Sequence, residues 1–350
     1  MDKTLFWAAF LSWLLLVSVV QTTAQSIVLE VQIDGAVPAV VPEGIEYFNG
    51  RFLIGSLASN SLFSVQKKDT SQTAEAELFF NGTGFFTGSV GLHVDGTDLY
   101  VSSGLFPPAA YGAGIILHDI EASSPSLSGP FDFSPFYSVG TPNDVVSTPS
   151  RDSYWTETIN GMVFKVSAQG TTTLFTSGGL LAPQAQGEFG ANGIEYFRGG
   201  DGTEYLLVGR AASTNGALIR IPINSPSSTH QVTYPGTSRN LAFGADGLFF
   251  HSSGDLFLAD NPTASVRRLR SSDDLLTAEL VEERSFSFNP PQVLTTITID
   301  SDDHVWGLYP GNFDPTQPNY IVRFDFVSAA ALMYASSLLC CMVAIVFLLV

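Results

Sequence analysis

Four side chains with oxygen donor atoms precede closely similar short segments of this 350-residue sequence. They are Glu43, Asn143, Asn192 and Asp246, and the segments that begin with them read Glu-Gly-Ile, Asn-Asp-Val, Asn-Gly-Ile and Asp-Gly-Leu. Carboxylate and amide oxygens are typical ligands of hard divalent cations. If the fold brings the four together, the sequence predicts a centre for Ca²⁺, with Mg²⁺, Mn²⁺ and Zn²⁺ as alternatives, although the zinc patterns CxxC and HExxH are absent.

The spacing of these residues favours the metal over a simpler interpretation. Asn-Asp, Asn-Gly and Asp-Gly are ordinary turn dipeptides, so any one of them alone indicates a turn. With Val90 and Thr295, however, the four residues form a series at intervals of 47 to 54 residues, which marks one position of a repeat. The pentapeptide Gly-Ile-Glu-Tyr-Phe follows both Glu43 and Asn192, as expected if the local structure is kept while the ligand in front of it changes.

Each repeat unit continues with a turn rich in Asn, Asp, Gly and Ser and with further short apolar and aromatic segments. Such segments are typical of β-strands joined by hairpins. Six units predict an all-β fold, a six-bladed β-propeller with four antiparallel strands per blade. Residues 27–33 precede the first unit and are expected to add the fourth strand to the last blade, which would close the ring. Because the first strand of each blade lines the central channel, residues at one repeat position would face one another there.

The two ends of the chain are predicted to lie outside this domain. Residues 1–24 resemble a secretory signal peptide, with an uncleaved anchor as the alternative. Residues 327–350 carry no charge and are long enough to span a bilayer. They are also compatible with a removable signal for a glycolipid anchor attached at Ser328-Ala329-Ala330. The expected organisation is a signal peptide 1–24, a propeller 25–326 and a hydrophobic tail 327–350, in a secreted or surface-anchored monomer attached to the membrane through its tail.

Composition narrows the class of partner. The formal net charge of −18 argues against nucleic acid, which requires basic patches, and suits a bound cation. Both cysteines, Cys340 and Cys341, lie in the tail, so the predicted domain has no disulfide and depends on its core and on metal. Asn81 begins the one N-glycosylation sequon and is a candidate glycan site.

Four motifs at blade-length spacing resemble the regucalcin and gluconolactonase family of calcium-dependent six-bladed propellers. That family is related to diisopropyl fluorophosphatase, the paraoxonases and the strictosidine synthase-like proteins. The resemblance covers roughly residues 40–326. The motifs are Pro-Glu-Gly-Ile at 42–45, Pro-Asn-Asp-Val at 142–145, Ala-Asn-Gly-Ile at 191–194 and Ala-Asp-Gly-Leu at 245–248.

The resemblance implies that Glu43, Asn143, Asn192 and Asp246 bind a catalytic metal and that Asp246 also acts as a general base. It further implies hydrolysis of a small-molecule lactone or related ester. In that chemistry the ion polarises the reacting oxygen and lowers the pKa of a water, and Asp246 accepts the proton.

The sequence departs from its relatives at two of the matched positions. The gluconolactonase branch places an Arg where this chain has Thr141, and the paraoxonase branch places a His where it has Val90, so neither a sugar-lactone substrate nor a His-dependent mechanism is the expected one. Of five histidines, only His93 lies inside an inner strand three residues after a repeat position, and catalytic participation is not the preferred interpretation of it. His251 and His304 are expected to be solvated. The loops at 104–114 and 178–190 are expected to determine specificity.

Two further interpretations belong to other functional classes. The first is a non-catalytic, calcium-stabilised propeller that serves as a cell-surface binding module, because propellers host many unrelated functions. The second is a condensing role like that of strictosidine synthase, for which the sequence offers no support. Finally, Arg267, Arg268 and Arg270 are expected on the third strand of the fifth blade, where they would form a solvated outer face and not a substrate clamp.

Overall fold

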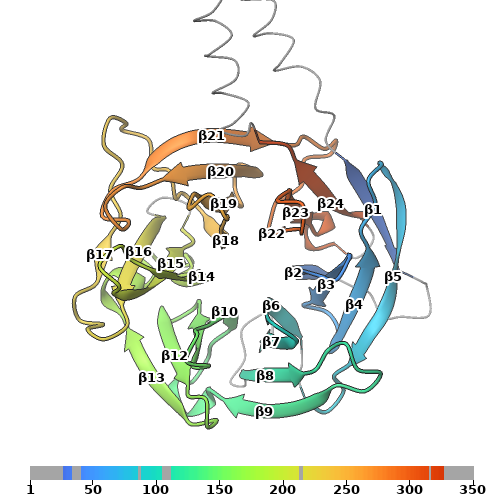
Figure 1. Cartoon of the computed structure of the whole chain (residues 1–350), viewed down its shortest axis with the longest axis horizontal. Helices are drawn as coiled ribbons and strands as arrows, with labels where there is room; N and C mark the ends of the chain where they lie inside the picture. Colours follow the sequence, from blue (N-terminus) through green and yellow to red (C-terminus); the bar gives the residue numbers. More distant parts are fainter. Residues whose placement is uncertain are drawn as a thin grey trace, which may run out of the picture. The chain divides into compact units, whose positions relative to one another are not determined.

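Antiparallel β-sheets arranged around a central opening contain nearly all of the regular secondary structure of the described chain (Figure 1). A computed structural model describes residues 27–33, 41–85, 88–104, 112–212, 216–314 and 317–326. The predicted signal peptide, the predicted tail and residues 105–111 of one expected specificity loop lie outside these ranges. Within them, no helix is long and apolar enough to cross a bilayer.

Four sheets contain four strands each, in sequence order. The first consists of β6 (Ser89–Asp95), β7 (Asp98–Ser103), β8 (Ala113–His118) and β9 (Ser126–Asp132). The second consists of β10 (Pro142–Ser147), β11 (Ser153–Glu157), β12 (Met162–Val166) and β13 (Thr172–Ser177). The third consists of β14 (Ala191–Arg198), β15 (Glu204–Arg210), β16 (Ala217–Pro222) and β17 (His230–Gln231). The fourth consists of β18 (Ala245–Phe250), β19 (Leu256–Asp260), β20 (Ser265–Arg270) and β21 (Glu279–Ser285).

The remaining strands form one eight-stranded sheet in the order β2-β3-β4-β5-β1-β24-β23-β22. Its early strands are β1 (Val28–Ile33), β2 (Pro42–Phe48), β3 (Arg51–Ser56), β4 (Ser61–Gln66) and β5 (Gln72–Asn81). Its late strands are β22 (Thr296–Ile299), β23 (Val305–Tyr309) and β24 (Asn319–Phe324). The 3-10 helices are η1 (Ser134–Phe136), η2 (Gly179–Leu181) and η3 (Gly311–Phe313). The all-β, four-stranded antiparallel pattern expected from the sequence is therefore present.

The N-terminal strand β1 joins the beginning of the described chain to its end. It pairs antiparallel with β24, as the sequence predicts for residues 27–33, with Val28 opposite Val322. It also pairs in parallel with β5, which the sequence did not indicate. Because both long edges of β1 are paired, neither β5 nor β24 is left as an open edge.

An ion-pair cluster adds a second link between the early and the late strands. Lys67, which follows β4, places its Nζ 2.8 Å from Asp300 Oδ2 and also binds Asp302. Asp300 is buried and accepts a hydrogen bond of 2.8 Å from Trp306 Nε1. Burial alone would raise the pKa of Asp300, but the hydrogen bonds from Lys67 and Trp306 lower it to about 2.

Five inner strands share a bulge at the predicted repeat position. In β2, β6, β10, β14 and β18 the pairing with the next strand shifts across the residue pair that begins at this position. Such bulges re-aim side chains and are frequent near functional sites. The repeat position is therefore a backbone feature as well as a pattern of residue types.

The glycine after the repeat position has a steric reason. A Cβ added to Gly44 would overlap the carbonyl oxygen of Val90, and one added to Gly193 would overlap that of Asp246. Only glycine allows neighbouring inner strands to approach so closely. This explains why Gly-Ile recurs while the residue in front of it varies.

The expected solvated face of arginines on β20 is wrong for two of its three members. Arg267 and Arg268 are buried, and only Arg270 is well exposed. Arg267 Nε lies 3.0 Å from Glu283 Oε1, and Arg268 donates to Asp255. The third strand β20 is paired on both edges, with β19 and β21, and carboxylates of these neighbouring segments offset the cost of burying the arginine charges.

Candidate metal-binding site

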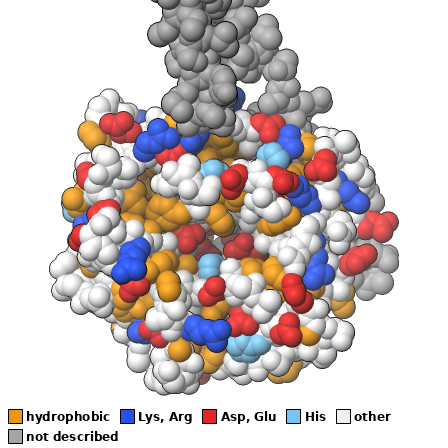
Figure 2. Space-filling view, viewed as in Figure 1, with side chains coloured by type: hydrophobic (Ala, Val, Ile, Leu, Met, Phe, Trp, Pro, Cys, Tyr) orange, Lys and Arg blue, Asp and Glu red, His pale blue; other side chains and the backbone are white. Residues whose placement is uncertain are grey.

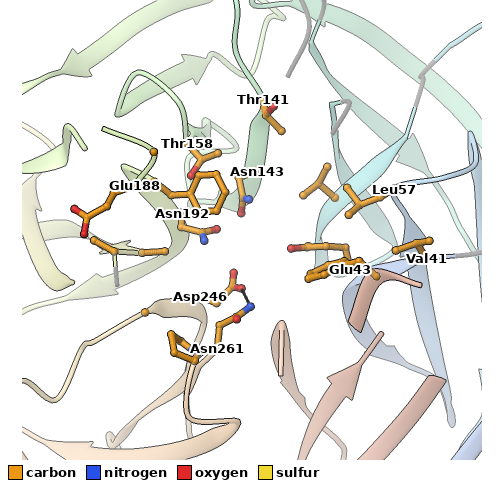
Figure 3. Close-up of a pocket in the computed structure, with 18 of the residues that line it drawn as sticks. Val41, Glu43, Leu57, Thr141, Asn143, Thr158, Glu188, Asn192, Asp246 and Asn261 are labelled. Atoms are coloured by element: carbon orange, nitrogen blue, oxygen red, sulfur yellow. Dashed lines mark hydrogen bonds between the residues drawn. The ribbon is translucent and has the colours of Figure 1, made fainter. Parts of the chain in front are cut away.

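A cavity of about 500 Å³ lies at the beginnings of the inner strands. All four predicted ligands line it, and each is the second residue of its strand: Glu43 in β2, Asn143 in β10, Asn192 in β14 and Asp246 in β18. Figure 3 shows their side chains reaching toward one shared space from separate ribbons. The structure thus brings together four residues that span about 200 positions of sequence.

The other two members of the repeat series behave differently. Val90 lines the cavity with an apolar side chain. Thr295 does not line it, because its Oγ1 donates a hydrogen bond of 3.2 Å to the carbonyl oxygen of Glu43 and is used in the fold. Of the residues in the repeat series, the four oxygen ligands and the apolar Val90 therefore line the cavity.

Burial raises the pKa of both predicted carboxylate ligands. The pKa of Glu43 is well above its usual value because of burial first and then the negative charges of Asp246 and Asp144. Burial raises the pKa of Asp246 to about 8, against the opposing effect of a hydrogen bond from Asn261. Without a cation, both groups therefore bind protons more readily than exposed carboxylates do.

Acidic groups continue along the same inner strands. Burial raises the pKa of Asp144 to about 7, although its carboxylate accepts a hydrogen bond of 3.0 Å from the backbone of Ile194. Three residues beyond two of the ligands, Glu46 and Glu195 also have pKa values raised to about 8 by burial. Figure 2 shows acidic side chains gathered beside the central opening. This concentration of carboxyl groups suits a cation.

An unpartnered oxygen tests whether the residues fit a metal. Asn192 is 5% exposed, and its Oδ1 has no hydrogen-bond partner within the described part of the chain. A buried carbonyl oxygen without a partner costs about 1–3 kcal/mol. Two carboxylates and two amides, one of which carries this free oxygen, form a ligand set that Ca²⁺ accepts, so the residues fit the ion.

The sequence did not identify Asn261. Its Nδ2 donates a hydrogen bond of 3.2 Å to Asp246 Oδ2, and it lines the cavity (Figure 3). Asn261 directly follows β19, the second strand of its sheet, and Leu57, Thr158 and Ala211 directly follow β3, β11 and β15 and line the cavity too. The site therefore uses a second repeat position, at the end of each second strand, which could have been found by aligning the repeat units over their full length.

That second position is held next to the first by one recurring backbone hydrogen bond. The N–H of the residue that follows the second strand donates to the carbonyl two residues before the ligand position: Leu57 to Val41, Thr158 to Thr141, and Asn261 to Gly244. Each inner strand thus brings its ligand beside a residue of the neighbouring strand.

His93 lies in the inner strand β6, as the sequence indicated, and it is not among the described residues that line the cavity. Its Nε2 lies 3.0 Å from Ser147 Oγ on the adjacent inner strand, and burial lowers the pKa of His93 to about 4. It is therefore neutral at physiological pH. The expected loop at 178–190 does reach the cavity, through residues 187–189.

A second group, made of two aspartates and one histidine, has donor atoms close enough together to hold a metal ion. The donor atoms of Asp300, Asp302 and His304 lie within 4.8 Å of one another. Lys67, however, already binds both carboxylates. The ammonium group of Lys67 thus compensates negative charge of this cluster, and the cavity is the better candidate for a metal site.

Comparisons with known proteins agree with the fold. No protein-family model and no curated protein sequence matches this chain. Among solved structures, the Malassezia sympodialis allergen Mala s 1 has a TM-score of 0.63 at 15% identity, covering 86% of this chain and 96% of that one. A luciferin-regenerating enzyme has a TM-score of 0.56 at 12% identity, covering 87% and 98%. A gluconolactonase from Xanthomonas campestris has a TM-score of 0.54 at 11% identity, covering 82% and 87%.

These matches span nearly the whole of each related chain. The structure therefore resembles gluconolactonase-type β-propellers, as the motifs indicated. At such low identity the likeness establishes the fold and leaves the activity to be argued from the site.

Proposed function

We propose that this chain is a divalent-metal-dependent hydrolase of lactones or related esters, built as a six-bladed propeller. Dividing the eight-stranded sheet at the parallel β1–β5 pair gives two meanders, which with the four separate sheets make six. The observation that carries the function is the convergence of four oxygen ligands from four inner strands on one cavity, with Asn192 Oδ1 unpartnered among the described residues. The structural likeness to a protein named as a gluconolactonase supports this choice.

In this proposal Glu43, Asn143, Asn192 and Asp246 hold the ion. When bound, a divalent cation supplies a Lewis acid for the carbonyl oxygen of the substrate. The positive charge also favours the ionised form of Asp246, whose pKa is otherwise raised to about 8 by burial.

Ionised Asp246 then serves as the general base that accepts a proton from the attacking water. Asn261 orients this carboxylate by donating to its Oδ2. Thr158 is 4% exposed, and its hydroxyl lines the cavity without a hydrogen-bond partner among the described residues. It is available to donate to a substrate oxygen.

Hydrolysis of a lactone panel with and without a chelator tests this function. We expect turnover of at least one lactone, a loss of activity of at least about 100-fold after chelation, and recovery when Ca²⁺, Mg²⁺ or Mn²⁺ is returned. Heat-denatured protein gives the background. Folded, metal-loaded protein that opens no member of the panel would argue strongly against the hydrolase.

A non-catalytic binding module is the alternative. Mala s 1, which has the same fold, is named as an allergen and not as an enzyme. Stabilisation by Ca²⁺ without turnover of any lactone would favour the module.

We also propose that the protein is secreted or surface-anchored, which fractionation of expressing cells would test. In keeping with the candidate glycan site, Asn81 is exposed at the end of β5.

A further inference from the structure

The cavity combines several polar side chains with an aliphatic wall. Figure 3 shows Asn143, Asn192 and Thr158 on one side, and Val41 and Leu57 beside Glu43 on the other. Val90 adds a further aliphatic side chain to the lining. At about 500 Å³ the cavity has the size of an ordinary small-molecule site, in which apolar walls bind most of the ligand and a few polar groups orient it.

The lining contains no positive charge. No Lys, Arg or His is among the described residues that line the cavity. The acidic residues of the lining are Glu43, Asp246 and Glu188, and the first two are the proposed ligands of the ion. A substrate with its own carboxylate or phosphate would lose its hydration, and no cationic side chain among the described lining residues would offset that cost.

Two phenylalanines stand at the edge of the cavity. Phe189, in the loop before β14, is 37% exposed, and Phe313, at the end of η3, is 43% exposed. They are the large exposed apolar side chains of the described chain that also line the cavity. Exposed aromatic rings beside a pocket are typical of contact with an apolar ligand.

Phe313 is also held in an unfavourable backbone conformation. Its φ is +59°, in the left-handed region, which is uncommon and unfavourable for a bulky residue. Glycine would adopt this conformation readily. A strained aromatic residue that is exposed at a pocket indicates a role in binding beyond the fold.

We propose that the site takes an uncharged lactone or ester with an apolar substituent, and that Phe189, Phe313 and the Val41–Leu57 wall bind that substituent. This inference rests on the proposed hydrolase and names its substrate class. Sugar acids and phosphate esters are disfavoured because they bring polar or anionic groups to an apolar wall and to a lining without a cationic side chain among its described residues.

The test compares three lactones and two sets of variants. γ-Nonalactone carries an apolar tail, γ-butyrolactone carries none, and D-glucono-δ-lactone is polyhydroxylated. We expect the wild-type protein to have its highest kcat/KM with γ-nonalactone. Phe313→Ala and Phe189→Ala should each lower the ratio of kcat/KM for γ-nonalactone over γ-butyrolactone by about tenfold, as is usual for lost apolar contact in a pocket. Leu78→Ala, which removes a 55% exposed side chain outside the cavity, should keep the wild-type ratio.

The possible failures are separable. A preference for D-glucono-δ-lactone, or unchanged ratios in both phenylalanine variants, would overturn the inference and leave the hydrolase standing. If no lactone is hydrolysed, the hydrolase fails, and calorimetric titration with γ-nonalactone decides the inference alone. Binding that weakens about tenfold in Phe313→Ala and not in Leu78→Ala would support it, and the absence of binding would overturn it.

Discussion

Replacing Asp246 with Asn is expected to lower kcat/KM for lactone hydrolysis by at least about 100-fold, the lower end of the range for general acid–base catalysis. The amide keeps the size of the carboxylate and an oxygen for the hydrogen bond from Asn261, but it cannot accept the proton and is a weaker ligand. Steady-state kinetics at saturating metal measures the loss. Asp69→Asn, which changes an exposed carboxylate outside the cavity, is the matched control and should retain full activity.

The same variant should become more stable while it loses activity. At pH 8 the buried carboxyl of Asp246 in the metal-free wild type is partly ionised, because burial raises its pKa to about 8, and a buried negative charge is costly. The amide that replaces it is neutral at every pH. We therefore expect the metal-free Asp246→Asn variant to unfold at higher urea concentration than the wild type at pH 8. Full turnover by Asp246→Asn would show that another group is the base.

Stability of the metal-free protein is expected to fall as the pH rises from about 4 to about 8. Burial raises the pKa values of Asp246, Glu46 and Glu195 to about 8 in the folded state, and in the unfolded chain they return to about 4. Between these values the folded state binds more protons, so their stabilising contribution is complete below pH about 4 and is lost as the pH rises through about 8.

Calcium should reverse this loss in a pH-dependent way. At pH 8, an ion concentration of about 100 times Kd should add about 2.7 kcal/mol to the free energy of unfolding. At pH 4 the protonated ligands compete with the ion, so the addition should be small. Urea unfolding at both pH values, with and without Ca²⁺, makes the measurement. Equal stabilisation at both pH values would contradict a site built from Glu43 and Asp246.

The repeat was readable from the sequence because one physical constraint recurs in four of its units, at Gly44, Gly91, Gly193 and Gly247. Inner strands approach so closely at Gly44 and Gly193 that no side chain fits, which keeps Gly-Ile after a variable residue. The position before each glycine therefore marks a bulge that faces the cavity. The partner of residues 27–33 was predicted for a different physical reason. An unpaired edge at β24 would be costly, and pairing with residues 27–33 removes it.

Other features could not be read from single segments because they depend on contacts between strands. Asn261, which follows β19, matters through its hydrogen bond to Asp246 in β18, and nothing in its own segment indicates a ligand neighbour. Arg267 and Arg268 read as surface charges until Glu283 and Asp255 are found opposite them. The unpartnered Oδ1 of Asn192 could not be predicted either. It is recognised only once the donors near it in the described structure are known.

Calorimetric titration of the protein with Ca²⁺ at pH 8 tests the metal centre most directly. The predicted result is one ion per chain, with affinity reduced at least about tenfold in Glu43→Gln and unchanged in Glu75→Gln, which alters an exposed carboxylate on β5. Absence of binding by any divalent ion, or equal affinity in Glu43→Gln and the wild type, would contradict the assignment of these four residues as a metal site.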